Sequence, residues 1–268
     1  MSGTDTALQT SPRVLPRVIA PANRTAVNRT ATRTGGERRP RVAVTLVVLI
    51  PAYKPDERLA ALVARLRGAR RDCAVLVVDD GSGPQYAPFF AAARARGAEV
   101  LGEIAGYGLS SDAHHITAPN PDGKYAAYAL NRALETAGAT PEQVSYVNAH
   151  GTGTELNDTT EVNVLRQALG DALEDIPVSS TKSAIGHLFG AAGAVETIAT
   201  LQALRHGQAP PTLGLKNLDK RLGRVRISGE PQDLAPGTFS AVDGTPKRLG
   251  LSNSLGFGGH NVTLAIRA

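Results

Sequence analysis

The sequence predicts an α/β protein with a large C-terminal domain, a smaller α/β unit before it and a disordered N-terminal tail. Three observations carry this prediction. Short β-branched runs alternate with segments of helical period, a pattern typical of βαβ units around a parallel sheet. Two of the strand-like runs lead into glycine-rich turns that contain histidine. The first 40 residues are rich in Thr, Arg, Pro and Ala and show no sustained periodicity.

Composition narrows the function classes. The chain has 268 residues, of which 42% are hydrophobic, so it can bury a core in one or two domains. Residues 1–41 hold eight Arg, one Asp and one Glu, a net charge of +6 against +5 for the whole chain. The remainder is therefore near neutral, which argues against nucleic acid as a partner. The longest apolar run, Val42–Ile50, is far shorter than the roughly 20 residues of a membrane span.

The tail and the cysteine content bear on localisation. We expect residues 1–40 to be a disordered basic tail, and their Arg-rich, acid-poor composition would also suit an organelle transit peptide. A signal peptide is not expected, because no basic segment leads into an apolar one. The lone Cys73 rules out an internal disulfide and suits a reducing compartment, so we expect a cytoplasmic protein.

Residues 41–97 are predicted to form a small Rossmann-like βαβ unit. Its strands are apolar and stop at Pro, Gly or Asp, and its helices carry apolar residues on one face. The expected elements, in order, are a strand at Val42–Tyr53, a helix at Asp56–Gly68, a strand at Cys73–Val78 and a helix at Phe89–Arg96.

Residues 98–268 are predicted to form the second domain. We expect helices at Tyr125–Ala137, Asp158–Leu169 and Ala191–Leu204. We expect strands at Ala98–Ile104, Val144–Asn148, Pro177–Ser180, Arg224–Ile227, Arg248–Leu251 and Asn261–Ile266. Residues 208–222 and 229–246 are punctuated by Pro and Gly and are predicted to be loops.

Three motifs in this domain carry a family resemblance. Residues 146–154 read YVNAHGTGT, residues 181–187 read TKSAIGH and residues 252–261 read SNSLGFGGHN. Together they resemble the C-terminal half of the β-ketoacyl-acyl-carrier-protein synthases, and the resemblance covers residues 97–268. It implies half of a thiolase-like fold and the decarboxylative condensation of malonyl- and acyl-thioesters in fatty-acid or polyketide synthesis.

The resemblance also implies roles for individual residues. His150 and His187 would present N–H groups to an enolate oxygen, and Lys182 would tune the site. Asp158 and Glu161 match the acidic partners of that lysine, and Glu196 matches an acidic position behind the second histidine. The binding positions would be the phosphopantetheine contacts Thr152 and Thr154, and the acyl-pocket turn at Phe257 and Gly258.

Simpler interpretations stand beside these roles. Asp158 and Glu161 also fit a capping box at a helix start. The hydroxyls of Thr152 and Thr154 could stabilise a turn, and Phe257 could be a core residue at a bulge. The remaining histidines are predicted to be surface or packing residues: His114, His115, His206 and His260.

The nucleophile of that family has no evident counterpart here. The family places a cysteine in a turn at a helix start, whereas Cys73 opens an apolar strand. The resemblance therefore predicts an incomplete enzyme that forms a homodimer or needs a ketoacyl synthase partner subunit. Acyl carrier protein is the expected partner, and phosphopantetheine would arrive on it. We expect no bound cofactor and no metal.

Residues 42–97 resemble a different family. The segments IPAY at 50–53 and VDDGS at 78–82 are similar to the opening of family-2 glycosyltransferases. The resemblance implies that Asp79 and Asp80 contact a nucleotide-sugar, while turn and helix-cap chemistry is the structural alternative. The alternatives to an incomplete ketoacyl synthase are thus a nucleotide-sugar-binding fragment and a non-functional fusion product.

Overall fold

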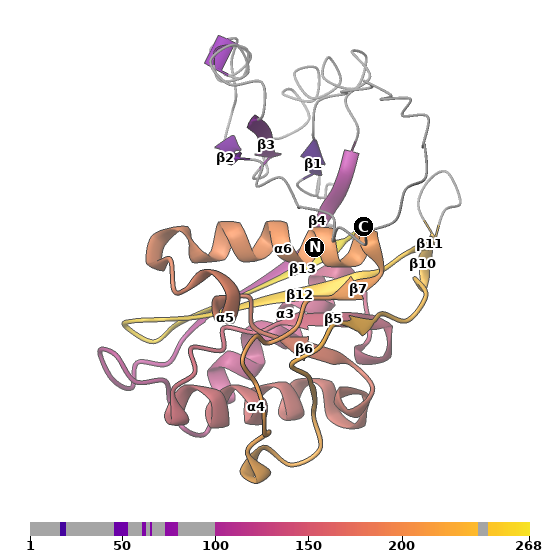
Figure 1. The fold of residues 1–268 in the computed structure, drawn as a ribbon. Coiled ribbons are helices and arrows are strands. Elements are labelled where there is room, and N and C mark those ends of the chain that lie inside the picture. The colour runs from indigo at the N-terminus through magenta and orange to yellow at the C-terminus, as the bar shows by residue number, and fades with distance from the viewer. Residues whose placement is uncertain are drawn as a thin grey trace, which may run out of the picture. The chain divides into compact units, whose positions relative to one another are not determined.

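The chain divides into two units, Met1–Glu99 and Val100–Ala268. The structure is a computed structural model (Figure 1). It describes residues 17–19, 46–52, 61, 62, 65, 73–79, 100–240 and 246–268.

The first unit contains three described strands: β1 (Arg17–Ile19), β2 (Leu46–Ala52) and β3 (Cys73–Asp79). β2 and β3 pair in parallel over their whole length, and β1 pairs antiparallel with β3. The strands expected at 42–53 and 73–78 are therefore present with slightly different ends. β1 lies within the stretch predicted to be disordered, and for its three residues that prediction is wrong.

Other predictions for this unit lie largely outside the described residues. In the helix expected at Asp56–Gly68, the described positions 61, 62 and 65 are helical. The helix expected at Phe89–Arg96 and the rest of the tail fall outside the described residues, so they stay predictions.

The second unit contains the elements that position the site. Its helices are α3 (Lys124–Ala137), α4 (Glu155–Leu169), α5 (Lys182–Ile185) and α6 (Ala192–His206). Its longer strands are β4 (Val100–Ser111), β5 (Val144–Asn148), β6 (Pro177–Ser179), β12 (Leu249–Gly256) and β13 (His260–Arg267). The two-residue strands are β7 (Gln208–Ala209), β8 (Arg226–Ile227), β9 (Gln232–Asp233), β10 (Phe239–Ser240) and β11 (Pro246–Lys247). Single 3₁₀ turns cover Pro141–Gln143, Gly170–Glu174, Phe189–Ala191 and Lys220–Leu222.

These elements form three layers (Figure 1). The strands run in the order β4-β13-β12-β5-β6-β8, with the first two pairings antiparallel and the last three parallel. Helix α6 covers one face, and α3 and α4 cover the other. The core lies mainly between the sheet and α3 and α4, where Leu130, Leu165 and Leu251 are fully buried. Apolar burial of this extent is the main stabilising term of such a domain.

Strand β4 is longer than the sequence predicts. The expected strand ends at Ile104, whereas β4 runs to Ser111 through Gly102, Gly106 and Gly108. These glycines lie where helices approach the strand closely. A Cβ at Gly108 would lie 1.7 Å from the Ala129 carbonyl oxygen of α3, and one at Gly102 would lie 2.3 Å from Leu201 of α6. Glycine in this strand therefore marks close packing rather than a loop.

Helix α4 begins three residues earlier than expected, at Glu155 with Thr154 as its N-cap. Asp158 is therefore inside the first turns, and its N–H donates to the Thr154 carbonyl at 2.9 Å. The capping box predicted for Asp158 and Glu161 is wrong, because neither residue lies at the helix start. The Glu161 carboxylate does not cap the helix start and can therefore form contacts elsewhere.

Within the part of the chain that the structure describes, no helix combines the length and the apolar character needed to cross a membrane.

The close packing of β4 predicts how two glycines respond to alanine. Gly108→Ala should lower the free energy of unfolding by about 1–3 kcal/mol, because the methyl group would overlap the α3 backbone. Gly193→Ala is the matched control, since its Cβ would meet only Ser254 Oγ at 3.8 Å within α6. Alanine in a helix is favoured by about 0.5–1 kcal/mol, so this variant should be neutral or more stable. Urea titration of both variants measures the difference, and equal effects would contradict the packing argument.

Candidate functional site

The two histidine turns leave the sheet side by side. Strands β5 and β6 are parallel neighbours, with Asn148 paired to Ser179 at their carboxyl ends. The segments that follow them carry His150 and His187, so both rings lie at the same sheet edge, where parallel sheets commonly build their sites. The ring centroids are 5.5 Å apart and the ring planes meet at 85°.

The backbone of the His150 turn is clamped by a buried carboxylate. The Glu161 side chain accepts hydrogen bonds from His150 N at 2.7 Å and from Gly151 N at 2.8 Å. On the other side, Ser180 Oγ donates to the Gly151 carbonyl at 2.8 Å. Gly151 has φ 39°, and a Cβ there would lie 2.5 Å from Ser180 Cβ. The turn therefore requires glycine and is fixed by hydrogen bonds on both sides.

His150 is held as a neutral imidazole. His150 is only 8% exposed, and this burial lowers the pKa of its imidazole to about 3. The nearby charge of Lys182 and the His187 ring lower this pKa further. Its Nδ1 is buried and has no hydrogen-bond partner among the described residues. A neutral ring carries one N–H donor at physiological pH, which is the form that can donate to a developing oxyanion.

His187 is exposed, and the backbone fixes its tautomer. Phe189 N donates to His187 Nδ1 at 3.1 Å, so in the neutral ring the proton must lie on Nε2. The Phe189 ring stacks on the imidazole with centroids 4.7 Å apart. Phe189 has φ 47°, a left-handed conformation that is uncommon for a non-glycine residue and that keeps the ring over His187.

Lys182 and Glu196 form a buried ion pair. Lys182 begins α5 and its Nζ contacts Glu196 Oε1 of α6, with the two side chains 5% and 2% exposed. Burial raises the pKa of Glu196, while Lys182 opposes this shift. The sequence-based expectation that Asp158 and Glu161 are the lysine's direct partners is wrong. Glu161 is occupied by the His150 turn, and the lysine pairs with Glu196 instead.

Asp158 and the two threonines lie around the turn after His150. Asp158 accepts from Gly153 N at 3.2 Å and from Asn157 Nδ2 at 3.1 Å. Thr152 and Thr154 contact each other through their hydroxyls at 2.9 Å. Gly153 has φ 75°, so the turn places both hydroxyls on one side. The turn-stabilising interpretation of the threonines thus has a direct structural basis, and a ligand contact stays a prediction.

Phe257 lies at the tip of the β12–β13 hairpin and is 66% exposed. Gly258, at φ 82°, donates its N–H to the Ile116 carbonyl at 2.7 Å. Among the described residues, Phe257 and Gly258 do not line the cavity beside His187. An acyl group inside that cavity would therefore not touch Phe257 or Gly258, and their contact with an acyl group stays a prediction.

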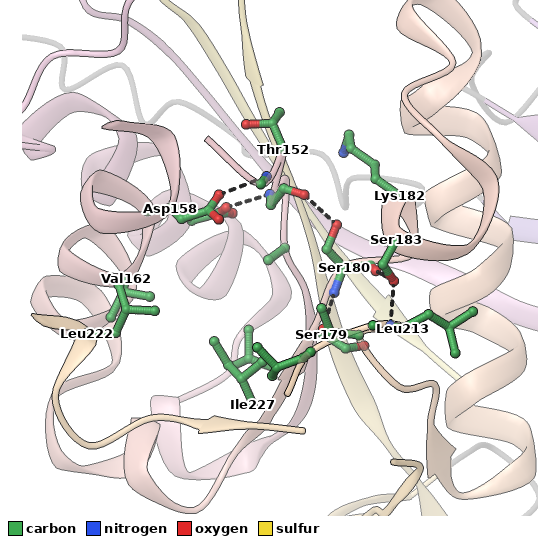
Figure 2. Close-up of a pocket in the computed structure, with 18 of the residues that line it drawn as sticks. Thr152, Asp158, Val162, Ser179, Ser180, Lys182, Ser183, Leu213, Leu222 and Ile227 are labelled. Atoms are coloured by element: carbon green, nitrogen blue, oxygen red, sulfur yellow. Dashed lines mark hydrogen bonds between the residues drawn. The ribbon is translucent and has the colours of Figure 1, made fainter. Parts of the chain in front are cut away.

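A cavity of about 530 Å³ opens beside the second histidine turn. Figure 2 shows Thr152 and Lys182 toward one end and Val162, Leu222 and Ile227 toward the other. The Ser183 hydroxyl accepts from Leu213 N at 2.8 Å and donates to Ser180 O at 2.7 Å. This size falls within the range of small-molecule sites. The cavity combines an apolar end with a polar end at the histidine turns.

Sequence reasoning did not single out two residues that contact the site. Asn253 of β12 donates to Glu161 Oε1 at 2.8 Å, and Phe189 supplies both the stack and the N–H described above. Asn253 lies two residues from both Leu251 and Leu255 in a strand pattern, and this is a usable signal, because a buried amide needs partners. Phe189 carries no comparable signal in the sequence.

Comparison with known proteins shows what the second unit is similar to. Residues 101–216 match the family described as β-ketoacyl synthase, C-terminal domain. This stretch of the chain is therefore similar to a β-ketoacyl synthase C-terminal domain. The 3-oxoacyl-(acyl-carrier-protein) synthase 2 of Synechocystis sp. is 46% identical over 191 residues, which are 71% of this chain and 43% of that protein. The corresponding enzyme of Vibrio cholerae is 42% identical over 71% of this chain and 44% of its own length.

Solved structures of ketoacyl synthases show the same similarity. A β-ketoacyl synthase from Burkholderia phymatum superposes with a TM-score of 0.57 at 34% identity, covering 66% of this chain and 40% of that one. A type II polyketide ketosynthase in complex with its acyl-carrier protein gives 0.58 at 30% identity, covering 67% and 41%. The resemblance predicted for the second domain is thus confirmed, and the chain spans less than half the length of these relatives.

The neutral, buried His150 makes the stability of the second unit depend on pH. Its folded pKa of about 3 lies below the ordinary 6.5, so between these values the unfolded chain binds a proton that the folded chain does not. The free energy of unfolding should therefore fall as the pH drops, by up to about 1.4 kcal/mol per pH unit from this residue. His150→Gln should show a shallower decline in denaturant titrations at pH 6.5, 5.5 and 4.5. Parallel declines in the two proteins would contradict the assignment.

Proposed function

We propose that this chain supplies the histidine half of a β-ketoacyl-acyl-carrier-protein synthase site. The observation that supports this most directly is the pair of imidazoles 5.5 Å apart, one neutral by burial and the other with its Nδ1 occupied by a backbone N–H. Each ring in that state offers one N–H. Two converging donors are what an enolate oxygen requires.

The proposed chemistry is decarboxylation of a malonyl thioester. The bond between the α-carbon and the carboxylate breaks, carbon dioxide leaves, and the electron pair moves into the thioester to give an enolate. The negative charge gathers on the thioester oxygen, where His150 and His187 donate hydrogen bonds. A single preorganised donor typically contributes about 10²–10³ in rate. Protonation of the enolate carbon by water gives the acetyl thioester, whereas attack of that carbon on the carbonyl of an acyl thioester, with loss of its thiolate, gives condensation.

The surrounding residues fit supporting roles in this proposal. Lys182 helps to keep His150 neutral, and Glu196 compensates the lysine's charge in the interior. Glu161 and Asp158 hold the turn from which His150 projects. Thr152 and Thr154 would contact the phosphopantetheine arm, and Phe257 and Gly258 would lie against the acyl group. We propose acyl carrier protein as the partner that delivers this arm.

Condensation needs an acyl group held on a nucleophile as well. The single cysteine of this sequence, Cys73, is the first residue of β3 in the other unit, not part of a helix-start turn that would stabilise a thiolate. We therefore propose decarboxylation as the activity of this chain alone, with condensation requiring a ketoacyl synthase partner subunit that supplies the nucleophile.

Release of labelled carbon dioxide from malonyl-acyl-carrier protein tests the proposal. The chain should release it slowly, because His187 is exposed and water weakens each hydrogen bond to the enolate. Replacing both donors in a His150→Ala, His187→Ala variant should abolish the release. His114→Ala is the matched control, as His114 is exposed and lies outside both turns.

Release that is equal in the double variant and the parent chain would show that the histidines take no part and would sink the proposal, while a parent chain that releases none would favour a fusion product without activity. Incubation with an acyl-acyl-carrier-protein thioester and intact-mass measurement is the second readout. An acyl adduct on Cys73 would contradict the separation of decarboxylation from condensation.

A second proposal concerns the first unit. β2 and β3 pair in parallel, and Ala52 and Asp79 face each other at their carboxyl ends. Ligands of parallel sheets bind at this edge. The pairing supports Asp79 as a nucleotide contact, as in the family-2 glycosyltransferases that this segment resembles, whereas Asp80 lies outside the described residues.

Equilibrium dialysis with a uridine diphosphate sugar tests this second proposal. Binding should be lost in Asp79→Asn and kept in Asp233→Asn, an exposed aspartate of β9 in the second unit. Failure of the parent chain to bind nucleotide sugars at millimolar concentration would contradict it.

A further inference from the structure

The position of the His150 ring is set through its backbone. The ring's Nδ1 has no hydrogen-bond partner among the described residues, so a side-chain contact at that atom does not orient it. The two backbone N–H groups at His150 and Gly151 both end on Glu161. A shift of the Glu161 carboxylate would therefore move the turn and the imidazole with it.

The Glu161 carboxylate is in turn held by a buried chain of side chains. Thr263 Oγ1 donates to Asn253 Oδ1 at 2.8 Å, and Asn253 Nδ2 donates to Glu161 Oε1 at 2.8 Å. Thr263 and Asn253 are directly paired residues on β13 and β12. The exposed fractions are 0% for Thr263, 1% for Asn253 and 2% for Glu161. The hydroxyl fixes which end of the Asn253 amide faces the carboxylate.

We infer that Asn253 and Thr263 are positioning residues for His150 and act on it through Glu161. The inference rests on the proposed decarboxylation at the histidine pair, which it deepens. These hydrogen bonds connect four elements: the end of β5, helix α4 and the hairpin strands β12 and β13. The same hairpin carries Phe257 at its tip, so the hydrogen bonds through Asn253 and Glu161 connect this hairpin to the His150 turn.

The chemistry of the chain favours positioning over simple packing. A buried carboxylate is costly unless it is fully hydrogen-bonded, and apolar residues would join a helix to a sheet at lower cost. Glu161 accepts hydrogen bonds from the two N–H groups of the histidine turn and from Asn253. The Asn253 side-chain oxygen in turn accepts from the Thr263 hydroxyl. Each member removes one degree of freedom from the next, which is how a reacting group is held to within a fraction of an ångström.

Thr263→Val tests this inference in the full chain, because valine keeps the shape and removes only the hydroxyl donor. The Asn253 amide would lose its fixed orientation and Glu161 its fixed donor. Hydrogen exchange measured by NMR should then show faster exchange of the His150 and Gly151 amides. Carbon dioxide release from malonyl-acyl-carrier protein should fall about 10-fold to 100-fold, since small misplacements of a reacting group cost rates of this order. Thr263→Ser keeps the donor and should restore both values.

Thr197→Val is the matched control. Thr197 is a buried threonine whose hydroxyl donates, among the described residues, to the Gly193 carbonyl alone, within α6 at 2.7 Å. It should leave the exchange of the His150 and Gly151 amides unchanged. Equal exchange of these amides in Thr263→Val and Thr197→Val would overturn the inference. Amide exchange can be measured without turnover. A chain without decarboxylase activity would therefore count against the proposed function, and amide exchange would still decide whether Asn253 and Thr263 position His150.

Asn253→Asp is a second variant that keeps the side-chain shape if Thr263→Val does not fold. It replaces the donor facing Glu161 by a carboxyl oxygen and should also speed exchange at His150 and Gly151. A wild-type scalar coupling between His150 N and the Glu161 carboxyl carbon would support the clamp directly. Retained amide protection in Asn253→Asp would overturn the inference on its own.

Discussion

The candidate site depends on one buried carboxylate. Glu161 lies on α4, yet its hydrogen bonds end on the turn after β5 and on β12, so it joins a helix to two strands that pack on it. Burial raises the pKa of this group, and three N–H donors oppose that shift. Without those donors the carboxylate would be an unpaired buried charge, which proteins rarely tolerate. The histidine turn and the carboxylate therefore stabilise each other.

The second buried charge works in a different way. Lys182 and Glu196 neutralise each other next to the histidines, and the Glu196 carbonyl accepts from Asn148 and Thr200. The ion pair joins α5 to α6 and sets the potential around His150, while the Glu196 backbone carbonyl joins α6 to the end of β5. One carboxylate holds the backbone of the turn, and the other holds a cation close to the ring. The sequence-based expectation instead paired Lys182 with Asp158 and Glu161 and placed Glu196 behind the second histidine.

Much of the domain could be predicted from sequence because its periodicity is strong. The strand at Val144–Asn148 and the helix ending at Ala137 match their expected bounds closely. The misses have physical causes. Gly106 and Gly108, which lie beyond the predicted end at Ile104, concealed the length of β4, since close helix packing and turn formation select the same residue. Spacing alone could place Glu161 near a helix start, but it could not show that the helix begins at Glu155. Partners such as Lys182 and Glu196 meet only through tertiary contacts.

The two histidines were found from sequence because each lies in a long motif, but their different surroundings were not. His150 is buried and His187 is exposed, although both follow parallel strands. The tautomer of His187 is set by the peptide N–H of Phe189 rather than by that residue's side chain. Any residue except proline could supply this N–H, and glycine would adopt the positive φ without strain. Position 189 is therefore permissive for the proton's place on the ring and restrictive only for the aromatic stack.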